Sequence, residues 1–150
     1  MFSAAQLPLQ SVRRVYRYVR SSVFNKPRPT GEYVSVNTRR LSLERRLGRL
    51  SYAPNWETSY YKRGEDVNLA RVMRVDSPKH PDVRWWQVHV RGWKQDDDTV
   101  ELTAHWEPEP TENPKAHLDG VGASVSAGMD ALCEDLREMG VEYTEFEYEG

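Results

Sequence analysis

Residues 83–106 read Val-Arg-Trp-Trp-Gln-Val-His-Val-Arg-Gly-Trp-Lys-Gln-Asp-Asp-Asp-Thr-Val-Glu-Leu-Thr-Ala-His-Trp, and this stretch decides the fold. It consists of two runs in which apolar and polar residues alternate, joined by five polar residues from Lys94 to Asp98. Alternation with a period of two is typical of a β-strand that is buried on one face. Two such runs with a short polar link predict a β-hairpin.

The alternation assigns the side chains of this hairpin to two faces. One face is apolar and is expected to lie in the core: Trp86, Val88, Val90, Val100, Leu102, Ala104 and Trp106. The other face carries two tryptophans among polar groups: Trp85, Gln87, His89, Arg91, Trp93, Thr99, Glu101, Thr103 and His105. A turn centred on Asp96 predicts three cross-strand pairs, namely Arg91 with Glu101, Val90 with Leu102, and Trp86 with Trp106. In an alternative register, His89 and His105 approach each other.

The rest of the chain predicts helices and further strands around the hairpin. Helices are expected over residues 9–24, 39–50 and 124–139, and strands over residues 32–37, 57–62, 67–75 and 141–148. The patterns over 39–50 and 67–75 fit either type of element; we favour a helix for the first and a strand for the second. Residues 52–55 predict a turn or loop. Residues 107–114 read Glu-Pro-Glu-Pro-Thr-Glu-Asn-Pro and predict an extended, polyproline-like connection that needs no packing partner.

These elements predict an α+β fold. We expect an antiparallel β-meander sheet of about five or six strands with helices packed on one face. A basic amphipathic helix is expected as an N-terminal arm. Residues 1–30 are assigned to this arm and a Pro-rich linker, and residues 31–150 to a single α+β domain.

The composition is that of one ordinary globular domain without a membrane span. The chain has 150 residues, of which 38% are hydrophobic and 29% charged, and no apolar run approaches the length that a bilayer requires. The first residues lack the apolar core of a secretory signal, so a cytoplasmic or virion location is expected. The single cysteine, Cys133, excludes an internal disulfide. The absence of isoleucine and the predominance of arginine over lysine are typical of GC-rich coding. Together with the acidic C-terminal part, this amino-acid usage resembles that of halophilic proteins.

Charge is distributed unevenly along the chain. Residues 1–50 hold eleven Lys or Arg and two Asp or Glu, whereas residues 101–150 hold two and thirteen. Such asymmetry favours contact with an acidic partner, or head-to-tail association between copies of the chain.

Two groups of residues are the predicted partner-binding sites. The first is the basic side of the arm, with Arg13, Arg14, Arg17 and Arg20. The second is the polar and aromatic face of the hairpin, with Trp85, His89, Arg91 and Trp93. Arginines neutralise phosphates and tryptophans stack on bases, so a nucleic acid is an alternative to a protein partner. For the hairpin face, cover by another part of the chain is the competing interpretation.

The sequence holds no motif of a catalytic or metal site. It lacks a nucleophile elbow, a phosphate loop, a dinucleotide fingerprint and a His-Glu-x-x-His spacing. We therefore predict no catalytic residue, no metal, no cofactor and no small-molecule substrate. A hydrolase or metal enzyme stays a third hypothesis, which requires that His89, His105 and carboxylates converge in the fold.

The functional expectation is a non-enzymatic structural or adaptor protein. It would dock on a protein partner, or on copies of itself, in a larger assembly such as a virion or tail component of a halophile virus. A nucleic-acid-binding protein that uses the arginine-rich helix is the alternative. The apolar stripe of the arm consists of Leu9, Val12, Tyr16, Val19 and Val23. If this stripe is not covered by the chain's own sheet, an external partner is expected.

Overall fold

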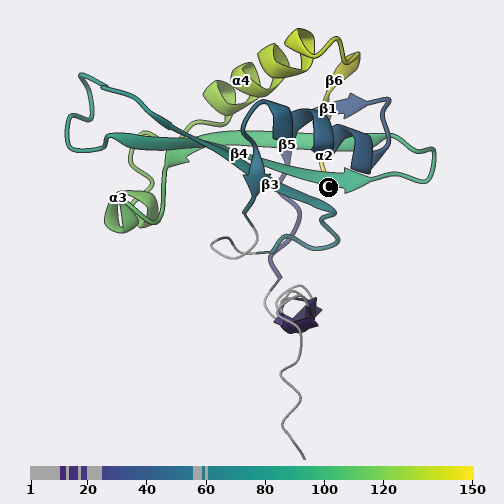
Figure 1. Cartoon of the computed structure of the whole chain (residues 1–150), viewed down its shortest axis with the longest axis horizontal. Coiled ribbons are helices and arrows are strands. Elements are labelled where there is room, and N and C mark those ends of the chain that lie inside the picture. The colour runs from purple at the N-terminus through teal and green to yellow at the C-terminus, as the bar shows by residue number, and fades with distance from the viewer. Residues whose placement is uncertain (1–10, 13, 17, 20–24, 56–58, 60) are drawn as a thin grey trace, which may run out of the picture.

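A computed structural model describes residues 11, 12, 14–16, 18, 19, 25–55, 59 and 61–150. Its elements follow along the chain as β1 (Gly31–Val36), α2 (Arg40–Arg49), β2 (Ala53–Pro54), β3 (Val67–Arg74), β4 (Trp85–Lys94), β5 (Val100–Pro108), α3 (Pro114–Leu118), α4 (Val125–Glu138) and β6 (Tyr143–Tyr148) (Figure 1). In this part of the chain, no helix combines the length and the apolar character needed to cross a bilayer.

The six strands form one antiparallel sheet in the order β2-β3-β4-β5-β1-β6. Strands β2 to β5 are neighbours in the order in which they occur along the chain, as in the predicted meander, but its first strand is β2 and not the expected strand at 57–62. Strand β1 then joins the far side of β5, and the C-terminal strand β6 lies beside β1. The predicted α+β class is confirmed, as are the helix at 39–50 and the strand at 67–75.

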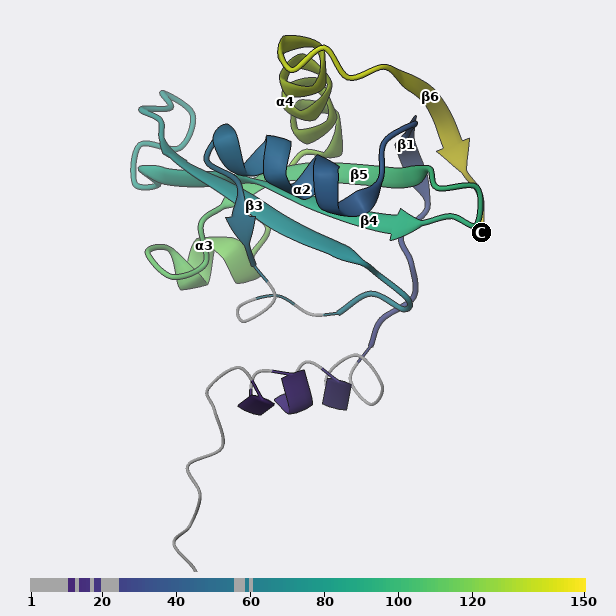
Figure 2. The same ribbon diagram turned by 45° about the vertical axis from the view of Figure 1, so that its right-hand side comes forward.

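Helices α2 and α4 cover one face of this sheet (Figure 2). Leu43 and Leu47 of α2, and Leu132 and Leu136 of α4, are fully buried in one cluster with the inward-facing strand residues. Those strand residues include the predicted apolar face: Val88, Val90, Val100, Leu102 and Ala104. Burying each such side chain stabilises the fold by about 1.5–3 kcal/mol.

The hairpin of β4 and β5 has the predicted faces but another register. His89 lies opposite His105, Val88 opposite Trp106, and Arg91 opposite Thr103, so the predicted pairs were wrong by two residues. The loop between β4 and β5 causes this difference in register. Asp97 accepts hydrogen bonds from the backbone N–H and the hydroxyl of Thr99, and this centres the turn on Asp97 rather than on Asp96. A shift of two residues exchanges partners without exchanging faces, because side chains alternate with a period of two.

Two further predictions need correction. Residues 53–54, expected as a turn, form β2 on the edge of the sheet. The expected strand at 57–62 lies partly outside the described residues, and in its described part only Lys62 makes a bridge, to Lys26.

The Glu-Pro segment at 107–114 is not an isolated extended connection. Strand β5 continues through Glu107 to Pro108, and α3 begins at Pro114. Glu107 and Glu109 are buried. The Glu109 carboxylate accepts hydrogen bonds from the backbone N–H groups of Thr111 and Glu112, which folds the segment into a turn.

The described residues of the expected arm are helical, and their apolar side chains are exposed. Val12, Val15 and Val19, at helical spacing, are 48%, 62% and 43% exposed. Arg14 is exposed as well. Three of the predicted binding residues lie outside the described residues: Arg13, Arg17 and Arg20.

Helix α4 meets β5 with direct backbone contact at Gly128. A Cβ atom added to Gly128 would lie 2.3 Å from the Cα of His105 and 2.4 Å from its carbonyl carbon. Strand backbone cannot move aside as a flexible side chain can. Only glycine therefore lets the helix approach the strand this closely.

We expect Gly128→Ala to lower the free energy of unfolding by about 1–3 kcal/mol or more, because it overpacks the contact between α4 and β5. Chemical denaturation measures this. Gly48→Ala in α2 is the matched control, since an added Cβ there meets nothing within 4 Å; it should stabilise the protein by about 0.5–1 kcal/mol. Equal effects of the two substitutions would contradict the close approach.

Candidate metal centre

The second face of the sheet is covered by irregular segments of the chain together with the short helix α3. The linker and the segment before β3 run together over it, held by the bridge between Lys26 and Lys62. The indole N–H of Trp93 donates to the carbonyl of Arg63, at 2.9 Å. Helix α3 also lies on this side, opposite α2 and α4 (Figure 2). Strand β4 is therefore buried on both faces.

This cover decides where the predicted binding residues of the hairpin lie. His89, Arg91 and Trp93 are buried, and only Trp85, which is 39% exposed, reaches the surface. The hairpin face is therefore not the open aromatic surface that the sequence suggested. Its role in binding a partner stays a prediction that now rests on Trp85.

Arg91 and Glu101 each have a partner other than the predicted one. The guanidinium of Arg91 binds the carboxylate of Glu65 at 2.7 Å. Glu101 is paired instead with Arg28 of the linker, at 3.0 Å.

A chain of buried hydrogen bonds starts at Glu65 and fixes the orientation of Asn68. The amide nitrogen of Asn68 donates to Glu65 at 2.9 Å and to the hydroxyl oxygen of Ser59 at 2.7 Å. That hydroxyl in turn donates to the carbonyl of Asn55. Because its nitrogen is committed to two acceptors, Asn68 presents its oxygen to the Nε2 atom of His89, at 2.7 Å.

This contact fixes the tautomer of His89. Burial disfavours the charged imidazolium and lowers the pKa of His89 from 6.5 to about 3, although its contact with Glu107 acts in the opposite direction. The neutral ring donates from Nε2 to Asn68, so its Nδ1 atom carries a lone pair. Nδ1 lies 3.2 Å from the Oε1 atom of Glu107. Two acceptors thus face each other in the interior, a contact that only a shared proton or a bound cation stabilises.

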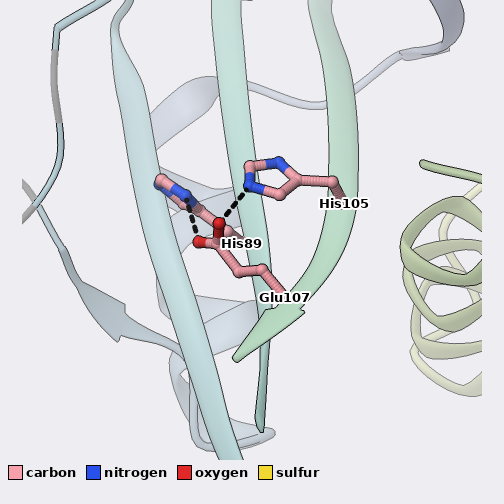
Figure 3. A group of neighbouring side chains, drawn as sticks. All are labelled: His89, His105 and Glu107. Carbon is pink, nitrogen blue, oxygen red and sulfur yellow. Dashed lines mark hydrogen bonds and ion pairs between the residues drawn. The ribbon is translucent and has the colours of Figure 1, made fainter. Parts of the chain in front are cut away.

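Glu107 is the centre of the cluster (Figure 3). Its Oε1 atom accepts a hydrogen bond from the amide of Gln87 at 2.7 Å, and its Oε2 atom lies 2.8 Å from the Nε2 atom of His105. His117 of α3 approaches Oε2 to 3.5 Å. Burial opposes ionisation of this carboxyl, but the hydrogen bond with the imidazole of His105 acts against burial, and the pKa of Glu107 is lowered below its ordinary 4.5. The carboxylate of Glu107 is therefore an anionic centre with imidazole nitrogen atoms beside it.

The strand pairing creates this arrangement. His105 and Glu107 are two residues apart on β5 and so share a face, while His89 is the cross-strand partner of His105. Sequence reasoning noted His89 and His105 but missed Glu107, because the prolines after it suggested a connection rather than a strand. The alternation of His105, Trp106 and Glu107 was the signal that the strand continues.

The geometry fits a metal ion. One ligand atom from each of His89, His105 and Glu107 lies within 4.8 Å of the others. A tetrahedral zinc site with bonds of about 2.0–2.1 Å places its ligand atoms about 3.3 Å apart. The contact between His89 and Glu107, at 3.2 Å, matches this separation, whereas the contact between His105 and the other carboxylate oxygen of Glu107 is shorter, at 2.8 Å. The hydrogen bond between Nε2 of His89 and Asn68 is of the kind that orients metal-binding histidines through their second ring nitrogen. Among the described residues, the structure thus brings together three of the groups that the metal-enzyme hypothesis required.

The same cluster predicts a loss of stability in acid. The pKa of His89 is lower in the folded protein than the 6.5 of the unfolded chain, and the pKa of Glu107 is also lowered. The unfolded chain therefore binds more protons as the pH falls below 6.5. We expect the free energy of unfolding of the metal-free protein to fall between pH 6.5 and about 3, by up to about 1.4 kcal/mol per pH unit from His89.

Denaturation over this pH range with a chelator present measures the effect. His89→Gln should flatten the pH dependence, whereas the control His80→Gln, in the loop before β4, should leave it unchanged. Equal slopes for wild type and His89→Gln would show that His89 is not held neutral.

The ligand set indicates which ions the site would take. Imidazole nitrogens favour zinc, copper, nickel and related ions over magnesium and calcium, which prefer oxygen ligands. The side chains of His105 and His117 are 30% and 26% exposed, so an ion could enter from their side. Comparison with protein-family models, with curated proteins and with solved structures finds no match to this chain.

Proposed function

We propose that this protein binds one divalent transition-metal ion of the zinc class through His89, His105 and Glu107. One observation carries the proposal: both ring nitrogens of buried His89 face oxygen atoms, Nε2 that of the Asn68 amide at 2.7 Å and Nδ1 that of the Glu107 carboxylate at 3.2 Å. A metal ion between Nδ1 and the carboxylate would satisfy both groups. His105 would complete a set of three protein ligands and leave a fourth position to water, as in zinc sites whose ligand can exchange.

Binding would also displace protons, which gives the site a pH dependence. The Nε2 atom of His105 contacts Glu107 in the metal-free protein, and it must be deprotonated to ligate a metal. Affinity should therefore decrease as the pH is lowered.

The direct test is calorimetric titration of the chelator-treated protein with Zn²⁺, with Mg²⁺ as the comparison ion. We expect one zinc per chain and no magnesium bound. Zinc at 100 times its dissociation constant should raise the free energy of unfolding by about 2.7 kcal/mol. His105→Ala and Glu107→Gln should weaken zinc binding by at least about tenfold, since even the outer partners of metal ligands contribute about that much.

His80→Ala is the matched control, because it removes a histidine that does not belong to the cluster. Zinc binding that persists unchanged in His105→Ala and Glu107→Gln, or no zinc binding by the wild type, would overturn the proposal.

A second candidate function is favoured by exposed valines of the arm, two of which, Val12 and Val19, belong to the predicted apolar stripe. Val12, Val15 and Val19 are exposed in the described part of the helix, and the surrounding sequence carries four arginines. Uncovered apolar side chains at helical spacing are typical of a helix that docks on a partner. This supports the structural or adaptor role, whereas the narrower proposal of a virion component rests on composition and charge alone.

We expect replacement of these three valines by serine to leave the free energy of unfolding within about 0.5 kcal/mol, as for surface positions. Val88→Ser, in the buried apolar face, is the control and should destabilise strongly. A large loss of stability in the arm variant would mean that these valines pack on their own domain, and would remove the argument for docking.

Binding of a DNA duplex that weakens steeply with salt, and is lost when the four arginines become alanine, would favour the nucleic-acid alternative.

A further inference from the structure

Arg28 of the linker is held in a cage of aromatic rings. Its guanidinium carbon lies 3.8 Å from the ring centre of Tyr148 and 4.6 Å from the ring centres of Tyr33 and Trp93. Its Nη2 atom pairs with the carboxylate of Glu101 at 3.0 Å, and its side chain is only 14% exposed. Cations are attracted to the faces of aromatic rings, most strongly where water is excluded. The cage and the carboxylate together bind the linker to the second face of the sheet.

The residues on either side of Arg28 are restricted as well. Pro27 and Pro29 flank it, and the ring of each proline fixes its backbone φ. The carbonyl of Pro29 also accepts a hydrogen bond from the hydroxyl of Tyr33, which is one ring of the cage. The backbone of the linker therefore has little freedom once Arg28 is docked.

The docked linker holds the segment before β3 in place. The backbone N–H of Lys26 donates to the carbonyl of Tyr61 at 2.8 Å, and the N–H of Arg63 donates to the carbonyl of Lys26 at 2.7 Å. The carbonyl of Arg63 accepts from the indole N–H of Trp93 at 2.9 Å, and the same indole contacts the linker arginine. The linker, this segment and Trp93 thus form a closed circuit of contacts.

The segment ends in Glu65, which fixes the outer partner of His89. The backbone N–H of Glu65 donates to the carbonyl of Lys62 within the same turn. The Glu65 carboxylate accepts from the amide of Asn68 at 2.9 Å, and the oxygen of that amide lies 2.7 Å from the Nε2 atom of His89. A displaced segment would move Glu65 and release the Asn68 amide, so His89 would lose the contact that orients its ring.

We propose that Arg28 is a positioning residue for the metal centre. The docked linker keeps Glu65 and Asn68 in place, and these two hold His89 in the orientation that binds the ion. This inference rests on the proposed zinc site. Coupling between two binding events is reciprocal, so an ion bound at His89 should in turn stabilise the docked linker.

Arg28→Ala in the full-length chain tests the proposal. We expect calorimetry to show zinc affinity reduced by about tenfold, the lower end of the loss seen when an outer partner of a metal ligand is removed. Arg71→Ala is the matched control, because Arg71 also contacts an aromatic ring and pairs with a carboxylate, but against α4. Its guanidinium lies 5.3 Å from the ring centre of Tyr52 and 3.1 Å from Asp135. The control should lower stability and leave zinc affinity unchanged.

A double-mutant cycle separates positioning from a general loss of stability. Asn68→Ala interrupts the route at its last step and should itself weaken zinc binding by about tenfold or more. Adding Arg28→Ala to this variant should cause no further loss, because both residues act through one route. Arg28→Lys keeps the cation and should recover most of the affinity.

Circular dichroism checks that each variant folds. Glu101→Gln weakens the docking of the linker without removing a ring or the arginine, and should reduce zinc affinity in the same direction. It tests the proposal independently if Arg28→Ala does not fold.

Hydrogen exchange measures the reciprocal effect. Saturating zinc should slow the exchange of the Lys26 and Arg63 amide hydrogens, which close the contact between the linker and the segment before β3. The same concentration of zinc relative to its dissociation constant should not slow them in Asn68→Ala.

The outcomes distinguish this inference from the zinc site itself. Unchanged zinc affinity in folded Arg28→Ala or Glu101→Gln would overturn the role of the linker and leave the zinc site standing. A further loss of affinity in the double variant would show that Arg28 does not act through Asn68, and would also overturn it. A wild type that binds no zinc would overturn the proposed site and this inference with it.

Discussion

Burial of β4 on both faces is the constraint on which the rest of the structure depends. The strand pairs with β3 on one side and β5 on the other, so its backbone groups are satisfied within the sheet. One face packs against the helical layer, and the second face is closed by the linker and the segment before β3. The polar side chains Gln87, His89 and Arg91 must then find partners in the interior, because an unpaired buried polar group costs about 1–3 kcal/mol. The route from Arg91 through Glu65, Asn68 and His89 to Glu107 supplies them.

The second face is polar because irregular chain covers it. A helix satisfies its own backbone groups and can rest on an apolar surface, as α2 and α4 do. A loop brings unpaired carbonyl and N–H groups, which need side-chain partners beneath them. The indole N–H of Trp93 donates to the carbonyl of Arg63, and the hydroxyl of Tyr33 donates to the carbonyl of Pro29. The buried polar cluster therefore follows from the kind of cover that the sheet receives, and the candidate metal centre belongs to this cluster.

The faces of the hairpin could be predicted from the sequence, whereas the cluster could not. Period-two alternation places Val88 inside and His89 outside in any register that preserves the pleat. The partner of His89 depends on where the chain turns, and this was decided by hydrogen bonds from Thr99 to Asp97. Glu107 was hidden by the prolines at 108 and 110, which suggested an extended connection. The cover of the second face has no periodic signal at all, because it is made of loops whose position is set by contacts distant in sequence.

His105 is held from both sides of the sheet. Its backbone meets Gly128 of α4 on the helical side, and its imidazole faces Glu107 on the other. A ligand whose backbone is fixed by such a contact needs little reorganisation to bind, which is the condition for a well-defined metal site. The proposed metal centre thus lies on the face of β5 opposite to α4, so that the helix fixes the strand without covering the site.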